Sequence, residues 1–382
     1  MNDGKKTPNG EIYAKRLEIF AEWMQSQEIA ASVFEDSEEK RNAAIRYFTG
    51  HPSDALLVIT NKAQSILLPW DVNLAGIMAH ATDIIPYMQF KKDAQKACAY
   101  VLRSKKIKKN ERVDIPESTY YNTFLEYVNV LQDWTVTCKK NENSSQKLIK
   151  MRAVKDESEI AAILAASEIT NTLIDEIEAN VRSGKIKTES DAALFIEKRS
   201  RELGAEGASF EILAAGPARS FGIHAFPPYT VGAFGTKGLS ILDFGVTKDG
   251  YRSDVTMTIA AGKLSSAQEA QIALMQDAYH ECLLLYKNGE SVLSPAKKCT
   301  SVFAKAKREM PHGLGHGVGL DIHEYPFVRT TATEDTLFQT GMVVTLEPGL
   351  YSPENGGCRY ENDILITDTG NAEITRSKIV RL

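Results

Sequence analysis

The chain has 382 residues, of which 43% are hydrophobic and 25% are charged, and its formal net charge is −5. This length exceeds what one hydrophobic core usually serves and fits two domains, and the composition is that of an ordinary globular protein. The small negative charge gives no general reason to expect nucleic acid as a partner.

Two features of the chain bear on its compartment. The polar start, MNDGKK, leads into no apolar signal core, and no apolar run reaches the length of a transmembrane helix. The five cysteines are odd in number and form no Cys-x-x-Cys pair, which is typical of reduced thiols. We therefore expect a cytoplasmic protein with no membrane partner.

Strands and helices alternate in the front half. Apolar spacing predicts strands over 55–60 and 65–70, and helices over 11–27, 71–80 and 92–105. This alternation is typical of an α/β domain. The polar stretch 137–147 is the best candidate for a linker. We place the boundary near Lys150, which gives domains 1–149 and 150–382.

The second half opens with predicted helices over 157–181, 188–203, 265–287 and from Ser294 to about 310. Thr188-x-x-Asp and Ser265-x-x-Gln are capping patterns. Ser294-Pro295 combines a cap with proline in the first turn. A pair of helices thus precedes each of the two pairs of β-prone runs.

The first pair of β-prone runs carries two aspartates. Asp243 lies in run 239–246 and Asp254 in run 251–259, and the Asp-Gly between them indicates a hairpin. If the loop has the four residues 247–250, the aspartates face each other with Cβ atoms about 4.5–5.5 Å apart. Carboxylates at that distance repel each other unless cations lie between them. Paired metal ions in hydrolases are about 3.5–4 Å apart, which fits.

The second pair of runs repeats the arrangement with two glutamates. Glu347 ends run 342–347 and Glu361 opens run 360–367, and 348–357 is rich in Pro, Gly and Asn, as in a turn. Four carboxylates would balance two divalent cations. His316, between glycines, adds one nitrogen ligand. Such a set suits Mn, Co or Zn rather than a thiolate-bound structural zinc.

The segment 312–324, HGLGHGVGLDIHE, and the five candidate ligands resemble the pita-bread metallopeptidases. The resemblance is to the branch of Xaa-Pro aminopeptidase (aminopeptidase P) and proline dipeptidase (prolidase). It covers about 150–382 and extends more weakly to the front half, which is similar to the amino-terminal domain of creatinase. It implies an α/β N-terminal domain followed by an α+β pita-bread catalytic domain.

The resemblance also implies two divalent metal ions, Mn first, with Co or Zn as alternatives. Asp254 and Glu361 would bridge both ions. Asp243 would bind one ion, and His316 and Glu347 would complete the other.

The activity implied is hydrolysis of an Xaa-Pro bond by a hydroxide that bridges the metals, with Glu347 taking its proton. His224 and His323 would stabilise the tetrahedral intermediate and help to protonate the leaving nitrogen. The glycines around His316 argue against a straight strand, so His316 and His323 could line one cavity. His312 would be a pocket residue. Arg359 would share the strand face of Glu361 and buffer the carboxylates, and we count it with the substrate-binding set.

Several alternatives stay open. The substrate implied is a small peptide with proline second, and the implied assembly is a homodimer. Many dipeptidases carry a basic residue just after His-Glu-x-Pro, but Phe327 stands there and the nearest basic residue is Arg329, so aminopeptidase and dipeptidase are both possible. A creatinase-like amidinohydrolase, or a non-catalytic binding member of the fold, would usually lack the full ligand set. The front domain disfavours a methionine aminopeptidase.

Overall fold

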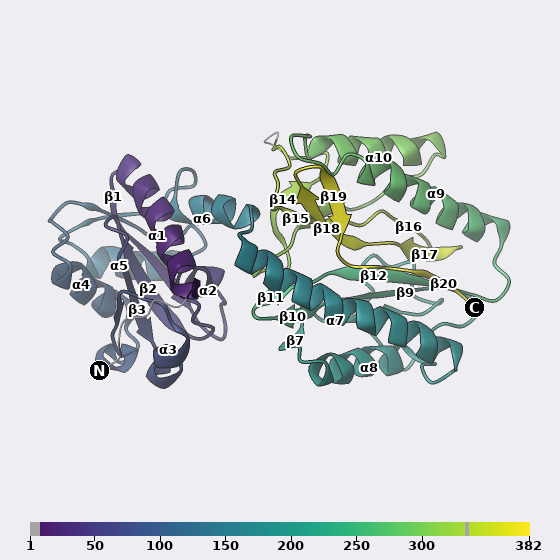
Figure 1. Ribbon diagram of the computed structural model, residues 1–382, viewed down its shortest axis with the longest axis horizontal. Coiled ribbons are helices and arrows are strands. Elements are labelled where there is room, and N and C mark those ends of the chain that lie inside the picture. Colours follow the sequence, from purple (N-terminus) through teal and green to yellow (C-terminus); the bar gives the residue numbers. More distant parts are fainter. Residues whose placement is uncertain (1–7, 333–335) are drawn as a thin grey trace. The chain divides into compact units, whose positions relative to one another are not determined.

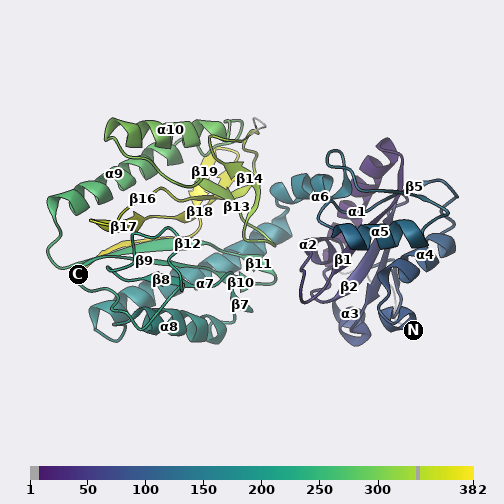
Figure 2. The same ribbon diagram turned by 180° about the vertical axis from the view of Figure 1, so that it is seen from behind.

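The computed structural model describes residues 8–332 and 336–382 (Figures 1 and 2). The chain divides into two compact units, Met1–Met151 and Arg152–Leu382, which are described separately. None of the described helices combines the length and the apolar character needed to cross a membrane.

The first unit contains a six-stranded mixed sheet in the order β4-β3-β2-β1-β5-β6. Its strands are β1 (Ile29–Asp36), β2 (Ala55–Thr60), β3 (Ser65–Pro69), β4 (Asp83–Ile84), β5 (Arg112–Asp114) and β6 (Thr135–Thr137). The helices are α1 (Pro8–Ser26), α2 (Ala43–Thr49), α3 (Val72–Met78), η1 (Tyr87–Phe90), α4 (Ala94–Ser104), α5 (Tyr121–Val130) and α6 (Ser144–Ala153). The α/β character predicted for this half is confirmed.

The stretch 137–147, which we expected to be a linker, is partly helical: α6 begins at Ser144. The Asn143 side chain accepts a hydrogen bond from the backbone N–H of Gln146 at 2.9 Å, which caps the new helix. Only 138–143 lies between β6 and α6.

The helices of the second unit are α7 (Glu157–Arg182), α8 (Glu189–Glu202), α9 (Ser266–Leu283) and α10 (Leu293–Lys305). The capping boxes expected at Thr188 and Ser265 are both present. However, α10 begins at Leu293 rather than at Ser294. The hydroxyl of Ser294 donates to Glu290 at 2.7 Å, so it does not cap the helix.

The strands of the second unit form several small sheets. They are β7 (Gly207–Ala208), β8 (Leu213–Ala215), β9 (Gly238–Phe244), β10 (Val246–Lys248), β11 (Tyr251–Arg252), β12 (Val255–Ala261), β13 (Gly315–Gly317), β14 (Glu324–Val328), β15 (Val343–Leu346), β16 (Gly349–Ser352), β17 (Gly356–Arg359), β18 (Asn362–Thr367), β19 (Gly370–Glu373) and β20 (Ile379–Arg381).

Each half of this unit combines a helix pair with a long hairpin, as the sequence predicted. Apolar side chains of α7 and α8 pack with those of β9 and β12 in one core, and α9 and α10 pack with β15 and β18 in another. Figure 1 shows the two helix pairs on opposite sides of the strands. The two hairpins meet where Thr256 and Glu361 form a β-bridge. The start of β12 and the residue before β18 therefore lie side by side.

Candidate active site

The first hairpin holds Asp243 and Asp254 on one face, but in a register that differs from our prediction. Lys248 pairs with Tyr251, so the turn is the two residues Asp249 and Gly250, with φ of 50° and 80°. Both angles fit the type I′ turn that Asp-Gly favours. Asp243 therefore faces Thr256 rather than Asp254. The expected direct pairing is wrong, and the aspartates are diagonal neighbours, about 7–8 Å apart at Cα.

A glycine makes room beside Asp254. Between β9 and β10, Gly245 lies so close to the opposite strand that a Cβ atom would stand 1.9 Å from the Ser253 carbonyl oxygen. No side chain fits there without moving the backbone. The regular ladder between β9 and β12 ends at this point, directly beside Asp254.

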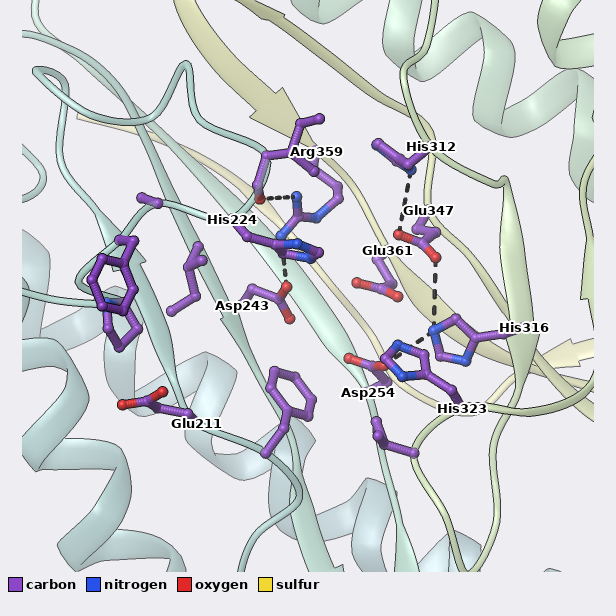
Figure 3. A pocket seen from close by; sticks show the side chains of 17 residues that line it. Glu211, His224, Asp243, Asp254, His312, His316, His323, Glu347, Arg359 and Glu361 are labelled. Atoms are coloured by element: carbon purple, nitrogen blue, oxygen red, sulfur yellow. Dashed lines mark hydrogen bonds and ion pairs between the residues drawn. The ribbon is translucent and has the colours of Figure 1, made fainter. Parts of the chain in front are cut away.

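The second hairpin repeats this interrupted pattern. Leu346 pairs with Asn362, and Gly349 pairs with Arg359, so Glu347 and Glu361 stand opposite each other at the break between β15/β18 and β16/β17. The region expected to be a turn is thus largely a further hairpin. Asp254, Glu347 and Glu361 lie where the ladders break, whereas Asp243 lies within the β9/β12 ladder. Figure 3 shows the four carboxylates gathered together with His316.

His316 completes the cluster from β13. Its backbone N–H donates to Thr345 Oγ1 at 3.0 Å, and its Nδ1 lies 3.1 Å from the Gly317 carbonyl oxygen. If Nδ1 carries the proton, Nε2 presents a lone pair to the carboxylates. Nε2 lies 3.7 Å from Asp254 Oδ2 and 3.7 Å from Glu347 Oε1. Burial, and then the neighbouring His323, lower the pKa of His316 to about 4.

These residues fit divalent cations. Ligand atoms of Asp254, His316 and Glu361 all lie within 4.8 Å of one another. Asp243 Oδ1 is buried and has no hydrogen-bond partner among the described residues. Burial, and then Asp243, raise the pKa of Glu361 to about 8, and burial followed by neighbouring carboxylates raises the pKa of Asp254 and of Glu347 well above the ordinary range. Buried carboxyl groups of this kind stay ionised only when positive charge lies beside them, and divalent cations would supply it.

Arg359 is the sole Arg or Lys among the described residues that line the cavity. It is 2% exposed, and its Nη2 donates to Asp243 Oδ2 at 2.6 Å. Its Nε donates to Thr256 Oγ1 at 2.9 Å and its Nη1 to the Tyr351 hydroxyl at 2.8 Å. Each of the three guanidinium nitrogens therefore donates at least one hydrogen bond, and the bond to Asp243 orients that carboxylate.

The cavity has a volume of about 420 Å³, and three more histidines line it. The rings of His316 and His323 are 4.3 Å apart at an angle of 73°, so both face one cavity. His312 lies 3.8 Å from Glu347 and is hydrogen-bonded to the Tyr351 hydroxyl at 3.0 Å. His224 approaches from the opposite side, near Arg359 (Figure 3). The structure thus brings every candidate residue from the sequence into one cavity.

Sequence reasoning missed several residues of this site. Tyr351 was hidden because 348–357 has the composition of a turn. Glu324, the first residue of β14, is buried and pairs with Arg152 and Lys155. Only its place directly after His323 could have drawn attention to it. Phe210 and Glu211 also line the cavity, although their stretch contains no motif.

Comparison with known proteins relates this site to a family. The model of metallopeptidase family M24 matches residues 161–368, more than half of the chain. A putative dipeptidase of Bacillus subtilis is 32% identical over 241 residues, which are 61% of this chain and 63% of that protein. A Xaa-Pro dipeptidase of Pyrococcus horikoshii is 32% identical over 234 residues, 60% of this chain and 64% of that protein. Both matches thus span less than two thirds of the relative.

A solved structure extends the likeness to nearly the whole chain. The X-Pro aminopeptidase from Thermotoga maritima superposes with a TM-score of 0.82 at 22% sequence identity, covering 97% of this chain and 99% of that one. The likeness shows the pita-bread fold predicted from the sequence, preceded by an α/β domain.

Proposed function

Because the chain belongs to metallopeptidase family M24, we propose that it hydrolyses the bond between a first residue and a proline in small peptides. The observation that carries this proposal is the buried cluster of four carboxylates and His316, which contains a single guanidinium. The Xaa-Pro dipeptidase name of the relative from Pyrococcus horikoshii supports proline as the second residue.

In this proposal the cluster would hold two divalent ions, and their ligands would be Asp243, Asp254, His316, Glu347 and Glu361. The bound ions would supply Lewis acidity and lower the pKa of a water at the cluster. Mn is the first choice, with Co or Zn as alternatives, because oxygen ligands with one imidazole suit these metals.

The other side chains orient the substrate and move protons. Glu347 accepts the proton of the attacking water, and His312 beside it helps to hold that carboxylate. His323 and His224 face the cavity from two sides, where they bind the substrate carbonyl and help to protonate the leaving proline nitrogen. Arg359 orients Asp243 through the hydrogen bond from its Nη2.

The cavity favours peptides that continue beyond the proline. A dipeptide ends in a carboxylate directly after the proline, and a dedicated dipeptidase needs a cation to hold it. Arg359 is engaged by Asp243, and the Arg329 guanidinium lies over the Phe327 ring, 5.2 Å from its centroid. We therefore place the activity closer to an aminopeptidase than to a strict dipeptidase.

The wider organisation is part of the same proposal. We assign 1–149 as a creatinase-like N-terminal domain and 150–382 as the catalytic domain, supported by the division of the chain after Met151. The resemblance of the sequence to its family supports a homodimer. The unpaired cysteines support a cytoplasmic location.

The test uses the Mn-loaded full chain with three peptides: Ala-Pro, Ala-Pro-Ala and, as a control, Ala-Ala-Ala. Release of alanine from Ala-Pro-Ala, read by mass spectrometry, is the expected result, with slower release from Ala-Pro and little from the control. Cleavage of Ala-Pro alone would make the protein a dipeptidase. No cleavage of either proline peptide, with bound Mn, Co or Zn demonstrated, would overturn the proposal.

A further inference from the structure

A bulge next to the ligand hairpin projects two side chains into the cavity. Ala208 pairs with Val246, and Leu213 pairs with Asp243. Four residues therefore lie between Ala208 and Leu213, whereas only two lie between their partners Asp243 and Val246. The two extra residues form a bulge, which is a common way to re-aim side chains beside an active site.

The bulge is held in place by its neighbours. The Ser209 backbone N–H donates to the Gly245 carbonyl oxygen at 3.0 Å, and the Ser209 hydroxyl donates to the Ser253 carbonyl oxygen at 3.0 Å. The Arg252 guanidinium also donates to the Ser209 carbonyl oxygen. Phe210 and Glu211, the next two residues, both line the cavity.

Glu211 is an anionic side chain without a counter-charge. Among the residues that the structure describes, none makes a hydrogen bond or an ion pair with its carboxylate, which is exposed. Figure 3 shows Glu211 apart from the ligand cluster, on the far side of Asp243 from Glu347 and His316. Once two divalent cations balance the cluster, Glu211 is the carboxylate that still lacks a partner in the cavity.

The cavity that Glu211 lines also has apolar walls. Phe210, Leu213, Phe226 and Pro228 belong to its lining, and Phe226 is 92% exposed. Apolar walls that lead to a carboxylate match a long aliphatic stem with a cationic end.

We propose that Glu211 selects peptides whose first residue is lysine or arginine. This inference rests on the proposed function and names the substrate class of that same site. The stem of the basic side chain lies along Phe210 and Phe226, and its charge meets the Glu211 carboxylate.

The covalent geometry of a peptide separates this role from recognition of the free amino terminus. The terminal nitrogen is only about 2.5 Å from the scissile carbonyl carbon, given bonds of about 1.46 and 1.52 Å. It must therefore lie close to the ligand cluster. Glu211 lies two residues along the chain from Leu213, the partner of Asp243, which corresponds to as much as about 7 Å. Figure 3 shows Glu211 apart from the cluster, and a side chain with four methylenes that starts at the cluster can extend toward it.

The experiment compares three peptides, Lys-Pro-Ala, norleucine-Pro-Ala and Glu-Pro-Ala, on the Mn-loaded full chain. Norleucine has the lysine stem without its charge. In the unaltered protein we expect kcat/KM to be about tenfold higher for the lysine peptide than for the norleucine peptide. Glu211→Gln should remove that preference, mainly by raising KM for the lysine peptide, so that the lysine-to-norleucine ratio of kcat/KM falls toward one. Glu211→Lys should favour Glu-Pro-Ala instead.

Glu168→Gln, an identical charge change on the exposed side of α7 and away from the cavity, is the matched control. A lysine-to-norleucine ratio that stays within twofold of the unaltered protein in Glu211→Gln overturns the inference, even though all peptides are cleaved. If the unaltered protein, with metal bound, cleaves none of the peptides, the proposed function fails first and this inference fails with it.

Discussion

Replacing Glu324 with glutamine tests whether a buried charge network supports the loop that carries His323. The Glu324 carboxylate accepts hydrogen bonds from Arg152 and from the Asp321 backbone N–H, the latter at 2.9 Å, and lies 3.5 Å from the Lys155 ammonium. All three charged side chains are at least nine-tenths buried. Glutamine keeps the shape but leaves two buried cations short of an anion.

The expected cost follows from this burial. Removing one partner of a buried ion pair typically costs about 3–5 kcal/mol. The lower end applies here, because Asp321 stays at 2.7 Å from Arg152. At 2–4 °C per kcal/mol for a domain of this size, Tm should fall by about 6–12 °C. Arg152→Met should cost less than Glu324→Gln, because Lys155 still pairs with the carboxylate.

The pH dependence has a defined sign. Burial alone would raise the pKa of Glu324, but Arg152 and Lys155 outweigh it and hold that pKa below its ordinary value. The stabilisation is therefore present above about pH 4.3, the ordinary range of a glutamate, and is lost as pH falls through the lowered pKa of the folded state. The difference in free energy of unfolding between the unaltered protein and Glu324→Gln should therefore become smaller as the pH falls into the acid range.

Differential scanning calorimetry on metal-free protein at pH 7 measures the effect without a contribution from bound ions. Glu168→Gln, whose change lies on the surface, should stay within about 0.5 kcal/mol. The reasoning fails if the free energy of unfolding of Glu324→Gln is within about 1 kcal/mol of that of the unaltered protein. The network would then contribute no more than an ordinary surface ion pair.

Three further changes probe the cluster and the cavity. Glu361→Gln alters the proposed ligand of both ions and should lower the metal content to less than one ion per chain, measured by elemental mass spectrometry. A metal content that stays at two ions per chain would contradict the role proposed for Glu361. Gly245→Ala should cost at least about 2 kcal/mol in a thermal melt, because its Cβ would meet the Ser253 carbonyl oxygen. Gly76→Ala, with open space around it, is the control, and equal melting of both would disprove the clash. Phe226→Ala should raise KM for proline peptides a few-fold, and an unchanged KM would exclude it as a cavity wall.

The sequence predicted element types better than it predicted their pairing. The capping patterns at Thr188 and Ser265 placed α8 and α9, because those signals act within a few residues, whereas α2, α5 and α6 were not predicted. The pairing of Asp243 with Asp254 was wrong because it assumed a four-residue loop. Asp-Gly occupies both central positions of a two-residue turn, and this choice displaces every pair by two residues.

The bulge shows why other parts of the site were out of reach. Nothing in Phe210 or Glu211 marks an extra residue, because a bulge is defined by what the partner strand does. The hydroxyl of Tyr351 likewise joins Arg359 and His312 only through the β16/β17 pairing. Long-range registers of this kind are set by packing, which local patterns do not record.

The arrangement of the site depends more on the number of residues in the hairpin turns than on which residues stand there. Inserting one residue at Asp249-Gly250 would turn one strand over relative to the other and send one aspartate to the opposite face. Substitutions there need only keep a left-handed backbone. The bulge before Leu213, one strand away, already absorbs two extra residues while the ligand pairs keep their register. Related proteins can therefore differ in the length and charge of that bulge, and so in the first residue that they would select. The number of residues in the Asp249-Gly250 turn, in contrast, has to stay the same.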